Sequence, residues 1–169
     1  MRMDKLTSQL QLALADAQSL ALGQDHNFIE PVHLLSALLD QSGGSSRPLL
    51  QKAGTDLGGL IAGVQTSLES LPSVSGTEGD VHMSNDLGRI LNVTDKLAQK
   101  NGDAYISSEL VLLAMLESKT PAGELLKSNG TTAAALNNAI SEVCSNKTFA
   151  ELVEFERDKR DKCAVNYSI

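Results

Sequence analysis

The sequence predicts an all-α fold in which two four-helix repeats are related by a pseudo-two-fold axis. Three observations predict it. Residues 28–64 return in altered form as residues 105–140, and such self-similarity marks duplicated structural units. Apolar residues recur at three- and four-residue spacing through most of the chain, which is the period of an amphipathic helix. Clusters of Pro, Gly and Ser separate the periodic stretches. No stretch shows the alternation of apolar and polar residues that is typical of a strand.

The repeat copies apolar residues and glycines rather than polar chemistry. Ile29 matches Ile106, and Asp40 matches Glu117. The other matched pairs are Leu10–Leu87, Leu14–Leu91, Leu20–Leu97, Ala21–Ala98, Leu34–Val111, Leu35–Leu112, Ala37–Ala114, Leu38–Met115, Leu39–Leu116, Leu49–Leu125, Leu50–Leu126, Gly54–Gly130, Thr55–Thr131, Leu60–Leu136 and Val64–Ile140. A copied apolar skeleton favours a duplicated binding module over a catalytic site.

The first repeat, about residues 4–70, is expected to begin with a helix over 4–22. Asp4 can cap the start of this helix, and Gly23 can end it. The second helix is expected from Pro31 to about Gln41, because the missing N–H of proline would be unpaired in a first turn anyway.

The third helix follows the segment SGGSS, with Pro48 near its start and Gly54 after its end. The fourth covers roughly 56–70. Its glycines each cost about 1 kcal/mol relative to alanine, so its intrinsic helix propensity is low. Residues 72–83, PSVSGTEGDVHM, lose the helical period and form the linker between the repeats.

The second repeat, about residues 84–144, is expected to begin with a helix over 84–100. Ser84 or Asn85 caps that helix, and Gly102 lies beyond its end. The next helix starts near Ser107, with Glu109 in its first turn, where a carboxylate complements the helix dipole.

The last two helices of the repeat also have recognisable residues at their ends. Pro121 opens one and Gly130 ends it, and Thr131 caps the other, about 132–144. Residues 1–144 therefore form the double-repeat domain, and 145–169 form a tail outside the repeat. In the tail, Phe149, Leu152 and Val153 could form one apolar stripe, which leaves an extra C-terminal helix over 148–160 open.

Composition bounds the partners. The chain has 169 residues, 41% of them hydrophobic, and its 14 Lys and Arg against 21 Asp and Glu give a net charge of −7. An acidic domain does not neutralise phosphates, so neither nucleic acid nor an anionic membrane surface is an expected partner. No signal peptide or membrane span is recognisable, and Cys144 and Cys163 are expected to be free thiols, so a cytoplasmic location is expected.

The motifs of common enzyme sites are missing from the sequence. It contains no G-x-x-x-x-G-K-[ST] phosphate loop, G-x-S-x-G, H-E-x-x-H or C-x-x-C. His26, His33 and His82 are expected to be structural or solvated, because no carboxylate or thiol follows His33 at the spacing of one helix face. The interpretation is that this chain is not an enzyme and holds no cofactor or metal.

Two groups of residues are candidates for protein binding. Thr7 is expected on the polar side of the first helix, while Asp103 and Glu109 lie in and after the turn between the fifth and sixth helices. Each has an ordinary local role, and together they could form an acidic, hydrogen-bonding surface patch. Val93, Leu97 and Leu110 are either core residues or the lining of a shallow groove between those two helices.

The segments LQLALADAQSLALGQDHNFIEPVHLLSALL and RILNVTDKLAQKNGDAYISSELVLLAMLES resemble the amino-terminal domain of the ClpB family of Hsp100 disaggregases, over about residues 1–143 and both copies of the Clp N repeat. The resemblance implies a module that captures unfolded or aggregated polypeptide. In that family it serves a hexameric ATPase that requires ATP and magnesium and works with the DnaK system under heat stress. The isolated domain is expected to be monomeric.

The resemblance also assigns candidate residues. Family positions implicated in function match Thr7, Asp103 and Glu109, and the family's apolar groove falls on Val93, Leu97 and Leu110. Two other functions stay open: an adaptor-docking domain of a protease-linked Clp unfoldase, and a free-standing scaffold. The client-facing surface is expected where the two copies differ.

Overall fold

The computed structural model describes residues 2–74 and 80–145, and most of these residues are helical. Eight α-helices within them confirm the predicted all-α class. In chain order the elements are a 3-10 turn η1 (Met3–Lys5), α1 (Ser8–Gly23), β1 (Phe28–Ile29), α2 (Pro31–Asp40), α3 (Ser46–Lys52), α4 (Leu57–Glu69), β2 (His82–Met83), α5 (Asn85–Asn101), α6 (Ser108–Glu117), α7 (Pro121–Ser128) and α8 (Ala133–Ser145).

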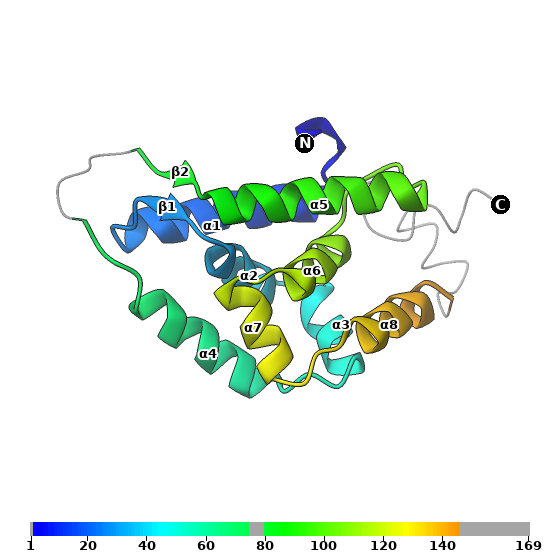
Figure 1. Ribbon diagram of the computed structural model, residues 1–169. Coiled ribbons are helices and arrows are strands. Elements are labelled where there is room, and N and C mark those ends of the chain that lie inside the picture. Colours follow the sequence, from blue (N-terminus) through cyan, green and yellow to red (C-terminus); the bar gives the residue numbers. More distant parts are fainter. Residues whose placement is uncertain (1, 75–79, 146–169) are drawn as a thin grey trace.

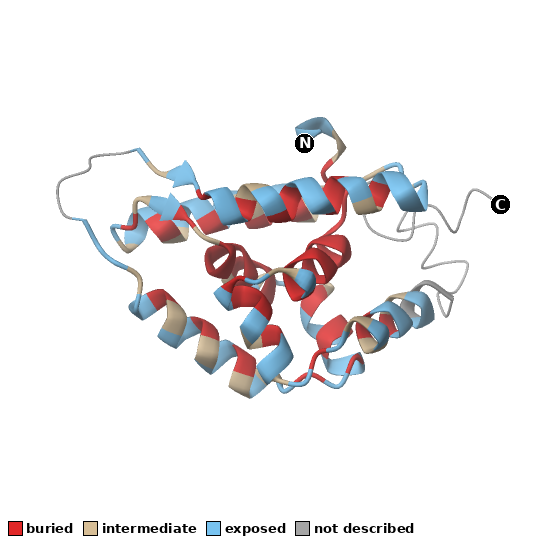
Figure 2. Cartoon of the chain, viewed as in Figure 1, coloured by how far each residue is buried: buried red, intermediate tan, exposed pale blue. Residues whose placement is uncertain are grey.

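The second helix of each repeat lies at the centre of the molecule. Figure 1 shows α2 and α6 in the middle, with α1 and α5 above them and the other four helices below. The burial colours of Figure 2 are red along most of α2 and α6 and mixed on the outer helices. Every residue from Ser108 to Leu116 is buried. A helix that is apolar on nearly every side belongs inside a domain, which is why α6 shows little amphipathic pattern.

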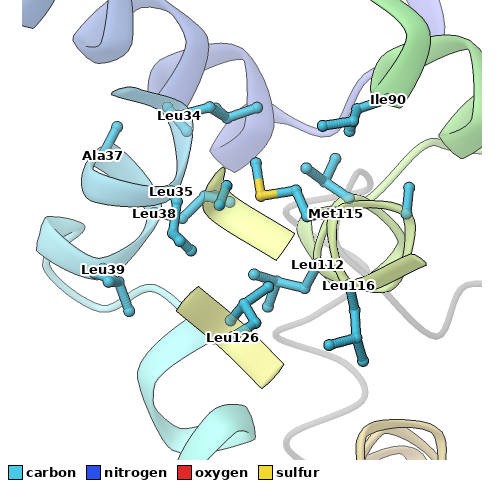
Figure 3. Close-up of a cluster of buried hydrophobic side chains, with 14 of the residues drawn as sticks. Leu34, Leu35, Ala37, Leu38, Leu39, Ile90, Leu112, Met115, Leu116 and Leu126 are labelled. Carbon is cyan, nitrogen blue, oxygen red and sulfur yellow. The ribbon is translucent and has the colours of Figure 1, made fainter. Parts of the chain in front are cut away.

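The copied leucines build the core. Figure 3 shows Leu35 and Leu38 of α2 facing Leu112 and Met115 of α6, with Leu126 of α7 beneath them. All five side chains are at most 1% exposed. Burial of each such side chain contributes about 2 kcal/mol, so this shared cluster helps to hold the two repeats together.

Reciprocal backbone hydrogen bonds demonstrate the pseudo-two-fold relation. The N–H of Thr7 donates to the carbonyl of Ile106 at 2.9 Å, and the N–H of Ser84 donates to the carbonyl of Ile29 at 3.1 Å. Thr7 and Ser84 occupy matching positions, as do Ile29 and Ile106. The residue that begins each repeat's first helix is thus held by the other repeat.

The two repeats also contact each other on the opposite side of the core. Helix α3 packs against α8, and α4 packs against α7, so each of these contacts joins the two copies. Matched residues Thr55 and Thr131 meet with their Oγ1 atoms 2.7 Å apart, and both are buried. The repeats therefore share one core instead of forming two separate bundles.

Two very short strands were not expected from the sequence. Phe28–Ile29 and His82–Met83 pair in parallel, and Leu6 and Ile106 form an isolated parallel bridge. In both pairings, the segment that leads into the first helix of one repeat lies beside the segment that joins the first and second helices of the other repeat. A two-residue strand cannot show an alternating pattern, so these pairings leave no signal in the sequence.

The predicted N-terminus of α1 is wrong. Thr7, rather than Asp4, is the N-cap residue, and its Oγ1 accepts a hydrogen bond from Leu10 N. Asp4 lies in the preceding 3-10 turn. The predicted end of α1 is correct within one residue, since Gly23 is the last residue of the helix and Gln24 is the C-cap. Asp and Thr are both favourable caps, so capping preference alone could not choose between them.

The predicted cap of α8 is also displaced. Thr132 Oγ1 accepts from Ala135 N, whereas Thr131 is buried against Thr55. The bounds of α2, α3, α4, α5 and α7 agree with prediction within two residues. Gly102, with φ +74°, ends α5 in the left-handed conformation that glycine tolerates. The extra helix over 148–160, and the central part of the expected linker, lie outside the described residues.

Candidate protein-binding groove

A groove of about 360 Å³ runs between α5 and the C-terminal end of α6 and continues along the loop to α7. Its α5 wall has a local origin, because Asp86, Ile90 and Val93 follow the spacing that places residues on one helix face. Val93 is 40% exposed, so its methyl groups are available to a partner. The full lining is Asp86, Arg89, Ile90, Val93, Ala114, Glu117, Ser118, Lys119 and Thr120.

The groove combines an apolar floor with a charged rim of balanced sign. Ile90, Val93 and Ala114 supply the floor, and the four rim charges are two carboxylates and two cations. Arg89 Nη1 lies 3.7 Å from Asp86 Oδ1, and both side chains are at least half exposed. Such an ion pair contributes less than about 1 kcal/mol, so it leaves both groups free to move for a bound chain.

A second pocket, of about 400 Å³, adjoins the groove at Arg89 and Asp86. Phe28 and Met83, from the two paired strands, line it together with Glu30, Ser84 and Asn85. Phe28 is 50% exposed, which is unusual for a phenylalanine in so aromatic-poor a chain. The two hollows together form one surface along the N-terminal half of α5, from Phe28 to Val93.

The three predicted groove residues separate in the structure. Val93 lines the groove, as expected. Leu97 is partly buried and packs against the core, and Leu110 is only 6% exposed inside α6. Neither Leu97 nor Leu110 lines the groove between α5 and α6. Apolar spacing could not distinguish these cases, because core and groove residues occupy neighbouring faces of the same helix.

Thr7 does not lie on the polar side of α1. It is 1% exposed, caps the helix through its hydroxyl, and binds Ile106 through its N–H. The structure therefore gives it a role in joining the N-terminus to the second repeat.

We predict that Thr7→Ala lowers the free energy of unfolding by about 1 kcal/mol, because it removes an N-cap hydroxyl. Ser84→Ala, at the matching cap where Oγ accepts from Leu87 N, should have a similar effect. Urea unfolding of both variants measures this. An unchanged midpoint for Thr7→Ala would contradict the structural role.

Asp103 and Glu109 lie near each other but not on an open surface. Burial and the nearby charge of Glu109 raise the pKa of Asp103, against a hydrogen bond from the Asn101 side chain. Glu109 is 2% exposed, and its Oε1 accepts a hydrogen bond from Ser45 Oγ at 2.7 Å. The expected acidic surface patch is therefore reduced to the half-buried Asp103, while Glu109 ties α6 to the loop before α3.

Among residues 2–74 and 80–145, no group of three or more His, Cys, Asp and Glu side chains could hold a metal ion. In the same ranges no helix combines the length and apolar character needed to cross a bilayer. The groove lining offers apolar contact, hydrogen bonding and weak ion pairing.

Sequence reasoning missed several groove residues. Ile90, Ala114 and Ser118 line it, and Phe28 and Met83 line the adjoining pocket. The one usable signal was the helix-face spacing from Asp86 through Arg89 and Ile90 to Val93. Ser118 gave none, because a serine after a helix is ordinary in sequence terms.

The fold is shared with solved N-terminal domains. The N-terminal domain of Hsp104 from Candida albicans superposes with a TM-score of 0.74 at 22% identity, covering 85% of this chain and 93% of that one. The N-domain of ClpV from Vibrio cholerae gives a TM-score of 0.66 at 21% identity, covering 86% of this chain and 88% of that one. These likenesses give the fold, which is the duplicated helical fold of Clp-type N-domains.

The sequence comparisons give the family. The model of the Clp repeat (R) N-terminal domain matches residues 5–129. ClpB chaperones are 55% identical in Pseudomonas putida and 52% identical in Vibrio cholerae, each over 143 residues, or 85% of this chain. The chain belongs to the Clp repeat N-terminal domain family, and it corresponds to the N-terminal part of ClpB chaperones. It spans 17% of the length of those relatives.

Proposed function

We propose that the chain is the client-capturing domain of a ClpB-like, ATP-dependent disaggregase. In this proposal the α5–α6 groove binds extended apolar segments of unfolded or aggregated protein. It then delivers them to a hexameric ATPase ring, which acts in the cytoplasm with the DnaK system during heat stress. ATP and magnesium belong to that ring and not to this domain.

The observation that supports the proposal most is the groove itself. Val93 exposes its methyl groups above the buried Ile90 and Ala114, while the rim charges cancel. An uncharged apolar segment meets neither net attraction nor net repulsion there, so its binding depends on burial of apolar area. A surface of this kind selects by apolar character more than by sequence, as a chaperone domain requires.

We predict that Val93→Asp weakens binding of a denatured model protein about tenfold, a loss of about 1.4 kcal/mol. The substitution places a charge on the apolar floor of the groove. Ile61→Asp is the matched control: Ile61 lies on α4, outside the groove lining, and its exposure of 38% is close to the 40% of Val93. Fluorescence anisotropy with a labelled, permanently unfolded protein measures both affinities.

Equal affinity of Val93→Asp and Ile61→Asp would contradict the groove assignment. Leu110 is unsuitable for this test, because a polar residue at a position 6% exposed would damage the core. Recovery of one folded protein in fixed stoichiometry, with no affinity for unfolded protein, would favour an adaptor-docking function instead.

A further inference from the structure

The pseudo-two-fold relation gives every groove position a counterpart between α1 and α2. Asp86 corresponds to Gln9 and Val93 to Asp16, because Leu87 matches Leu10 and Leu91 matches Leu14. At the ends of the central helices, Ser118 is the C-cap of α6 and Gln41 is the C-cap of α2. The two copies can therefore be compared residue by residue at the site that the proposed function uses.

In the first copy, a side chain bridges this position. Gln41 Nε2 donates to the carbonyl oxygen of Gln9 at 2.7 Å, and the bond is partly buried. This amide extends from the end of α2 to the first turns of α1. It occupies the place that corresponds to the groove of the second copy.

In the second copy the corresponding residue is too short to bridge. Ser118 Oγ donates to the carbonyl oxygen of Met115 at 2.6 Å and lies 2.8 Å from Thr120 Oγ1. Both partners are local, so the hydroxyl is held on its own side of the groove. The space between α5 and the end of α6 stays open, with Ser118 in its lining.

The side chain at the position of Val93 also differs between the two copies, and it favours binding in the second copy. Val93 offers methyl groups in the second copy, whereas its counterpart Asp16 is an exposed carboxylate. An uncharged apolar segment would lose hydration of that carboxylate without compensation. Both differences disfavour binding of an apolar segment between α1 and α2, and both favour its binding between α5 and α6.

We propose that Ser118 and Gln41 are the specificity-determining pair that confines client binding to one of the two pseudo-equivalent grooves. Ser118 leaves the α5–α6 groove open to one extended apolar segment, and Gln41 closes the α1–α2 side. The domain then binds one segment, oriented along α5. This inference rests on the proposed function and names the residues that limit it to one half of the duplicated fold.

The test uses the full 169-residue chain and a labelled, uncharged, apolar peptide without stable structure. Ser118→Gln should restore in the second copy the bridge that Gln41 makes in the first, and should weaken peptide binding at least tenfold. Ser19→Gln is the matched control, because it adds the same side chain at an exposed position of α1 outside the groove lining. It should bind as wild type does.

A gain-of-function variant decides the case even if Ser118→Gln does not fold. Gln41→Ser combined with Asp16→Val removes the bridge and supplies the apolar wall. Calorimetric titration should then give two peptides per chain in place of one. A stoichiometry that stays at one would overturn the inference.

The outcomes separate the inference from the function on which it rests. If wild type binds, Val93→Asp binds more weakly, and Ser118→Gln binds as well as Ser19→Gln, the groove stands and the role of Ser118 is refuted. If wild type itself does not bind the peptide, the proposed function fails, and the inference fails with it.

Discussion

Gly123→Ala is expected to lower the free energy of unfolding by about 3 kcal/mol, a large part of the stability of a domain this size. A Cβ at this position would collide with the backbone carbonyl of Met115 and come within 2.6 Å of the carbonyl oxygen of Ser118. Both atoms belong to the end of α6, so neither can rotate away as a side chain would. The glycine thus permits the close approach of α7 to α6 that places Leu126 in the core.

Gly88→Ala is the matched control for this prediction. Gly88 lies within α5, and a Cβ there meets no atom within 4 Å. Alanine should therefore stabilise by about 0.5 to 1 kcal/mol through its helix propensity. Urea unfolding measures both changes, and equal midpoints for the two variants would contradict the account of α6–α7 packing.

The second large effect that we expect is a loss of folding stability as the pH falls. His33 and His26 form a buried pair in which Nε2 of His33 lies 2.8 Å from Nδ1 of His26. The backbone N–H of Glu30 donates to Nδ1 of His33, so this nitrogen carries no proton and Nε2 is the donor to His26. Burial, and then the neighbouring His26, lower the pKa of His33 from 6.5 to about 4.

The lowered pKa of His33 determines how folding stability changes with pH. Between pH 6.5 and about 4 the unfolded chain binds a proton at His33 and the folded chain does not, so acidification favours unfolding. The contribution of His33 is intact above pH 6.5 and declines as pH falls through this window. Between pH 7 and pH 5 the loss is on the order of 1 to 2 kcal/mol, after allowance for solvent screening.

Urea unfolding at pH 7 and pH 5 measures this loss in wild type, His33→Asn and His82→Gln. His33→Asn should lose most of the acid sensitivity, whatever its effect on stability at pH 7. His82→Gln, which replaces the exposed third histidine, should retain it. An acid sensitivity unchanged in His33→Asn would show that the buried pair is not its source.

Much of the fold could be predicted because its signals are local. Pro31 and Pro121 begin helices, Ser84 caps α5, and Gly102 and Gly130 adopt positive φ after helices. The repeat correctly placed the duplicated leucines in one core. Local signals failed where two residues compete for one role, as Asp4 and Thr7 do for the cap of α1.

The site was harder to predict because it depends on contacts between distant segments. Val93 and Leu110 read alike as apolar helix residues, yet one is 40% exposed and the other 6%. Only the packing of α5 against α6 separates them. The bridge from Gln41 to Gln9 likewise depends on how α2 ends against α1, which neither residue reveals in the sequence. The copies differ at the groove positions Ser118 and Val93, and no groove-lining residue belongs to the turn before α6.

The central claim is that the α5–α6 groove binds unfolded protein, and amide chemical-shift mapping tests it most directly. The labelled 169-residue chain is titrated with a permanently unfolded model protein. The account predicts that the largest shifts cluster at Arg89, Val93, Ser118 and Lys119, with little change at Leu12 and Asp16 on the α1–α2 side. Largest shifts at Leu12 and Asp16, or none at the groove at saturation, would contradict it.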